Sequence, residues 1–186
     1  MDDETRAQNA ERLAATILSA SPQAIPGRRP LMALAYLLGR QQGIEADWES
    51  NYHGPHSASL GYAMERWIQS GAMAYVVTYD DRAPDPIEGA NAVLEVRDRK
   101  LLPVASELTI FARGLVNMAI ARKAFSVPAL ILAAKLAWAR ELVEATPAAG
   151  PLPKTAIELA RELKWSGLGE TEREAAVRLI DALYLY

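Results

Sequence analysis

The side chains of this sequence that could do metal chemistry gather in one stretch, which holds both histidines of the chain. His53 and His56 flank a Gly-Pro turn, and Asp47 and Glu49 precede them. Imidazole and carboxylate groups bind zinc, but a site needs three or four of them aimed at one point. A rigid Gly-Pro turn does not aim both imidazole rings at one ion. We therefore expect no metal centre and no cofactor.

Known catalytic motifs are absent from the sequence. The chain has no cysteine, no Gly-x-Ser-x-Gly nucleophile turn, no Gly-x-x-x-x-Gly-Lys phosphate loop and no His-Glu-x-x-His zinc motif. The acidic residues between positions 80 and 88 lack the spacing of a calcium loop, which predicts a solvated loop tip. We therefore expect a protein that is not an enzyme.

A second set of polar side chains could contact a nucleic acid. They belong to the polar face of a helix predicted over residues 57–70 and to the β-hairpin after it. Arginine can bind guanine and glutamine can bind adenine, while cations on a hairpin can hold phosphates. The candidate nucleic-acid-binding residues are His56, Ser59, Tyr62, Arg66, Gln69, Arg82, Arg97, Arg99 and Lys100.

The segment before this helix should set the direction of the helix. Gly54 permits an unusual backbone, Pro55 fixes φ, and Ser57 is a residue type that caps helices. Leu60 begins an apolar repeat that continues to Trp67, so we expect both side chains to be buried. The predicted structural motif comprises Tyr52, Gly54, Pro55, Ser57 and Leu60.

Periodicity places this motif among several helices and one hairpin. Strands over residues 72–79 and 92–96 are rich in β-branched and aromatic side chains, and a long acidic loop joins them. An almost wholly apolar helix over residues 129–144 should be central. A Thr-x-x-Glu capping box at residues 171–174 should start the last helix. The other predicted helices cover residues 5–20, 29–42, 102–122 and 154–164.

These elements predict a fold that is mainly α with a small β-hairpin. A capped helix followed by a hairpin is the order of recognition helix and wing in a winged helix-turn-helix. We expect a winged-helix-like part with an N-terminal helix over residues 1–100. A C-terminal helical part over residues 101–186 should pack on it, or both should form a single domain.

Three sequence blocks carry a resemblance to a known family. They are Ala-Leu-Ala-Tyr-Leu-Leu at 33–38, Tyr-His-Gly-Pro-His-Ser-Ala-Ser-Leu at 52–60, and Trp-Ile-Gln-Ser-Gly-Ala-Met at 67–73. In these blocks the sequence resembles the YwgA-like winged-helix proteins of bacteria and archaea, and it is more distantly similar to the Panacea antitoxin domain of SocA-type proteins. The chain departs from the family pattern at two places, at Met32 or Ala33, where the family has lysine, and at His56, where it has an aromatic residue. The resemblance covers about residues 28–186 and implies a winged-helix fold.

The distribution of charged residues along the chain leaves two functions open. Residues 1–100 hold ten basic and fourteen acidic side chains, and residues 101–186 hold ten and nine. Neither part has the strong basic excess that is typical of a nucleic-acid-binding protein. The first hypothesis is a DNA-binding module of the transcription-regulator type, with double-stranded DNA as partner. The alternative is a non-enzymatic protein-interaction module of the antitoxin or assembly type.

Hydrophobicity supports two further expectations. The most apolar stretch, residues 129–139, is interrupted by Lys135 and is too short to span a bilayer, and the Met-Asp-Asp-Glu start is no secretory signal. We therefore expect a cytoplasmic protein without a membrane partner. The helices over 102–122 and 129–144 carry much apolar surface, which a homodimer or the core of a monomer would cover.

Overall fold

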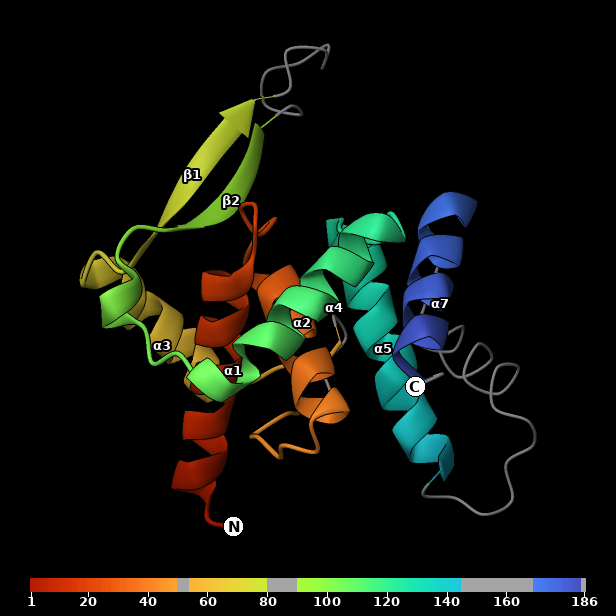
Figure 1. The fold of residues 1–186 in the computed structure, drawn as a ribbon, viewed down its shortest axis with the longest axis horizontal. Helices are drawn as coiled ribbons and strands as arrows, with labels where there is room; N and C mark the ends of the chain where they lie inside the picture. Colours follow the sequence, from red (N-terminus) through yellow and green to blue (C-terminus); the bar gives the residue numbers. More distant parts are fainter. Residues whose placement is uncertain (50–53, 80–89, 145–168, 185–186) are drawn as a thin grey trace.

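The computed structural model, which describes residues 1–49, 54–79, 90–144 and 169–184, is mainly helical with one two-stranded antiparallel hairpin (Figure 1). This confirms the mainly α class with a small hairpin. The elements follow in the order α1 (Asp3–Ala20), α2 (Arg28–Gln41), α3 (Ala58–Gln69), β1 (Met73–Tyr79), β2 (Ala90–Val96), α4 (Thr109–Ala121), α5 (Val127–Glu144) and α7 (Glu170–Tyr184), with 3₁₀ turns η1 (Arg99–Leu101) and η2 (Ser106–Leu108).

Helix α2 lies at the centre of the core. Every residue from Pro30 to Gly39 is buried, because α2 packs against α1, α4 and α5. Its Tyr36 hydroxyl donates a hydrogen bond to Glu141 of α5, and the Tyr36 ring packs on Trp48 and Trp138. A helix that is buried on all sides is central to a fold. The buried apolar residues of α1 to α7 form one continuous cluster.

The hairpin projects away from the helices, as Figure 1 shows. Its register pairs Met73 with Val96 and Tyr75 with Leu94. On the other edge of β2, Ile25 forms both backbone hydrogen bonds with Leu94, Ile25 N to Leu94 O at 3.1 Å and Leu94 N to Ile25 O at 2.7 Å. The segment between α1 and α2 is therefore joined to the hairpin by a single antiparallel bridge. The strand bounds agree with the sequence prediction to within two residues.

The helix predicted over residues 102–122 is wrong in its first part. Helix α4 begins only at Thr109, and residues before it form η1, η2 and extended backbone. Leu102 has φ −98° and ψ 138°, the extended conformation that a following proline favours, and Pro103 follows it. Pro103 therefore prevents an α-helix from starting at Leu102.

Helix α5 is covered within one chain, since α2 and α7 pack along it. Its apolar surface therefore needs no second copy of the chain, which removes one argument for a homodimer. Helix α7 begins at Glu170, so Thr171 lies inside its first turn and is not the N-cap. The helix predicted over 154–164 lies outside the described residues. Within the described ranges, no helix is long and apolar enough to cross a membrane.

Candidate interaction face

The start of α3 is fixed by a buried serine. Ser57 is fully buried, and its Oγ accepts a hydrogen bond from Leu60 N at 3.0 Å. The same hydroxyl donates to Asp47 Oδ1 at 2.7 Å. The predicted N-cap is therefore confirmed, and it has a carboxylate partner that the sequence reasoning considered only as a metal ligand.

The Gly-Pro turn positions this cap. Gly54 has φ +107°, which glycine adopts without strain, and it lies against Ile131 and Lys135 of α5. Gly54 and Pro55 are buried, and the backbone of His56 forms two hydrogen bonds with Glu49. Tyr52, the remaining residue of the predicted motif, lies outside the described residues. Burial of the turn against α5 agrees with a structural role.

The apolar side of α3 faces the core as predicted. Leu60 is fully buried and Trp67 is 5% exposed, and both belong to the continuous core cluster. Helix α3 packs on α1 and runs on into β1. Its opposite side is therefore left to solvent, with Tyr62, Arg66 and Gln69 exposed.

The arginine expected to read a base is held by α1. Arg66 Nη2 lies 2.9 Å and 3.0 Å from the two carboxylate oxygens of Glu11. The Glu11 side chain is 21% exposed, so this ion pair is partly shielded from water. Ser59, on the first turn of α3, is half-buried with its hydroxyl 3.0 Å from that of Ser57.

A second arginine joins α3 to the hairpin. Arg28, the first residue of α2, places Nη2 2.6 Å from Glu65 of α3 and Nε 3.0 Å from the Tyr75 hydroxyl of β1. The hydrogen bond to Glu65 raises the pKa of Arg28 above its ordinary value. Neither Arg28 nor Glu11 was singled out from the sequence, because their partners are far away along the chain.

The basic residues beyond the hairpin lie near the end of α3. The backbone N–H groups of Arg97 and Asp98 both donate to Ala72 O, which places η1 beside that end. Arg97 is paired with Glu95 at 3.3 Å. Arg99 and Lys100 are exposed and have no ion-pair partner among the described residues. Arg82 lies outside the described residues.

Exposed aromatic and apolar side chains share this side of the molecule. Tyr62 is 71% exposed, Tyr75 40% and Val77 52%. Tyr62 and Glu65 are one helical turn apart, and Val77 lies on the same side of β1 as Tyr75. Arg28 bonds to both Glu65 and Tyr75, so the two sets are neighbours. We call the surface formed by Tyr62, Glu65, Arg66, Gln69, Tyr75 and Val77 the α3–hairpin face.

The described residues contain no group of three side chains that could hold a metal ion. His53, one half of the histidine pair, lies outside the described ranges, and the Asp47 carboxylate is bonded to Ser57.

Comparison with protein-family models, with curated proteins and with solved structures finds no match to this chain. The resemblance to YwgA-like winged-helix proteins therefore stays a prediction.

Proposed function

We propose that the protein is a non-enzymatic interaction module that binds a partner protein through the α3–hairpin face. The observation that carries this proposal is the pairing of its charges. Arg66 on this face and Arg28 beside it each form an ion pair with a carboxylate of the same chain. A phosphate backbone would have to displace Glu11 and Glu65, and the released carboxylates would then repel it.

The uncharged side chains of the α3–hairpin face are of the kind that binds another protein. Tyr62, Tyr75 and Val77 present aromatic and aliphatic area to solvent, and tyrosine is enriched at the energetic centres of protein interfaces. The ion pairs around them form a rim that carries both signs of charge. The partner surface should therefore be apolar at its centre, with polar groups around it.

Double-stranded DNA is the second candidate. The order of α1, the bridge at Ile25, α2, α3 and the hairpin supports a winged-helix arrangement, and Arg99 and Lys100 could hold phosphates. Two features weigh against it. The α2–α3 connection spans residues 42–57, far longer than the three- or four-residue turn of a helix-turn-helix, and Arg66 is already paired.

A matched pair of variants tests the proposal. Tyr62 is 71% exposed on the face, while Val127 is 41% exposed at the start of α5, so alanine at either position should leave stability unchanged. After purification of tagged protein from its own host, Tyr62→Ala should lose a defined protein partner that the wild type and Val127→Ala retain. Retention of that partner by both Tyr62→Ala and Val77→Ala would contradict the proposal.

Salt dependence separates the two candidates. We expect duplex DNA of mixed sequence to show no saturable change in fluorescence anisotropy at 50 mM salt. Saturable binding that weakens steeply with salt, and that Arg99→Gln and Lys100→Gln reduce, would instead establish the DNA function.

A homodimer is a separate part of the proposal. Its surface would be the exposed side of α4, where Ile110 is 75% and Phe111 44% exposed. Sedimentation equilibrium at micromolar concentration decides it, because a single species of 20.3 kDa would exclude the dimer.

A further inference from the structure

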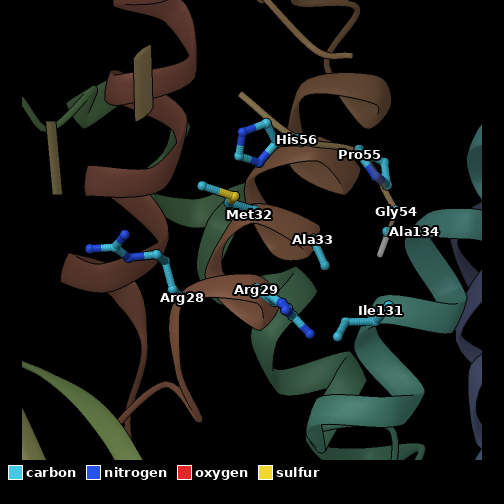
Figure 2. A pocket seen from close by; sticks show the side chains of 9 residues that line it. All are labelled: Arg28, Arg29, Met32, Ala33, Gly54, Pro55, His56, Ile131 and Ala134. Carbon is cyan, nitrogen blue, oxygen red and sulfur yellow. The ribbon is translucent and has the colours of Figure 1, made fainter. Parts of the chain in front are cut away.

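A cavity of about 200 Å³ lies between the start of α2 and α5. The contacts of Arg28 with α3 and the hairpin are on the opposite side of the first turn of α2. Its walls come from three separate segments, namely the first turns of α2, the turn at residues 54–56 and the middle of α5 (Figure 2). The lining residues Met32, Ala33, Gly54, Pro55 and Ala134 are buried, whereas the side chain of Arg29 is exposed at the mouth of the cavity. The cavity is therefore a feature of the tertiary fold and is distinct from the α3–hairpin face.

Among the described residues, every titratable side chain that lines this cavity is basic: Arg28, Arg29 and His56. Arg28 already donates hydrogen bonds to Glu65 and to the Tyr75 hydroxyl. Arg29 has no hydrogen-bond or ion-pair partner among the described residues. In Figure 2 its side chain extends toward Ile131 of α5, while Arg28 is turned to the opposite side. The cavity thus offers one uncommitted positive charge.

The remaining lining is mainly aliphatic. Met32 and Ala33 of α2 lie between His56 and Arg29 in Figure 2, and Ile131 and Ala134 of α5 form the facing apolar wall. The part of the chain that the structure describes places no carboxylate in this lining to neutralise Arg29. An apolar wall with a few convergent polar groups is the usual composition of a small-molecule site.

We infer that this cavity binds a small aliphatic carboxylate. The carboxylate group pairs with the Arg29 guanidinium, His56 supplies a further hydrogen-bonding group, and the hydrocarbon part lies against Ile131 and Met32. One water needs about 10–15 Å³ of a volume measured in this way, so a cavity of about 200 Å³ has room for a branched five-carbon acid.

The test uses three probes on the full-length protein. They are 3-methylbutanoate, its uncharged amide 3-methylbutanamide, and inorganic phosphate, which has charge but no hydrocarbon. The chain contains two histidines, so the imidazole ¹H–¹³C signals are easily resolved, and a His53→Gln variant assigns that of His56. We expect a saturable shift of the His56 signal with 3-methylbutanoate and binding about tenfold or more weaker for the other two probes.

Each probe has an outcome that overturns part of the inference. If the amide bound as tightly as 3-methylbutanoate, the charge of the ligand would not contribute to binding. If phosphate bound as tightly as 3-methylbutanoate, the apolar wall would not contribute. The absence of any saturable shift with 3-methylbutanoate would overturn the site itself.

Variants locate the binding. Arg29→Gln should weaken 3-methylbutanoate binding about tenfold or more, whereas Arg113→Gln, an exposed arginine of α4 that does not line the cavity, should leave it unchanged. Ile131→Ala should weaken it as well by removing apolar contact, with a thermal melt confirming that the variant is folded. Unchanged binding in both Arg29→Gln and Ile131→Ala would place the ligand elsewhere and refute the inference.

Discussion

Replacing Ser57 with alanine should destabilise the protein by about 2 kcal/mol. The change removes the N-cap of α3, which is worth about 0.5–2 kcal/mol in other helices. It also leaves the N–H of Leu60 without its partner at a fully buried position, where an unsatisfied donor costs about 1–3 kcal/mol. These two contributions describe the same lost bond, so we do not add them.

Ser70→Ala is the matched control at the other end of the same helix. The Ser70 hydroxyl donates to Trp67 O at 3.2 Å and the residue is exposed, so its loss should cost less than about 0.5 kcal/mol. Urea unfolding followed by tryptophan fluorescence measures both variants. Asp47→Asn keeps an acceptor oxygen for Ser57 and should fall between them. A Ser57→Ala midpoint within error of Ser70→Ala, at unchanged slope, would refute the reasoning.

Trp67→Ala should cost about 3–5 kcal/mol in the same urea assay, because the side chain is only 5% exposed; a neutral result would show that the core-facing side of α3 is misassigned. Gly54→Ala should cost about 1–3 kcal/mol because φ is +107°, whereas Gly61→Ala, inside α3 with nothing within 4 Å, should stabilise by up to about 1 kcal/mol. The hydrogen bond from Thr5 N–H lowers the pKa of Asp2, so the stabilising effect of Asp2 is present above its ordinary pKa of 3.8 and is lost as pH falls through the lower value of the folded protein. Circular dichroism should therefore show lower helicity for Asp2→Ala than for wild type at pH 7 and no difference at pH 2.

Local features of the fold were predictable from the sequence. The Ser57 cap, the apolar repeat from Leu60 to Trp67 and the β-branched and aromatic strands depend on residues within a few positions of one another. The difference at residues 102–108 also has a local cause, because Pro103 favours an extended backbone at Leu102.

The ion pairs on and beside the α3–hairpin face were not predictable from such local patterns. Arg66 is paired with Glu11, 55 residues earlier, and Arg28 with Glu65, 37 residues later. Nothing in the local pattern of either helix indicates these partners, because ion pairs between helices depend on which faces meet. The sequence also did not indicate that α2 and α7 of the same chain pack along the apolar surface of α5.

The sequence by itself determined most of the helices, both strands and which side of α3 is apolar, because caps and periodicity act over one or two turns. Only the tertiary structure decided which basic side chains are engaged and where a cavity remains. Arg28, Arg29 and His56 line one cavity with residues of α5, since the packing of α2 against α5 brings distant segments together. Neighbouring residues can therefore have opposite roles, with Arg28 bound to Glu65 and Arg29 left with an unpaired charge among the residues described.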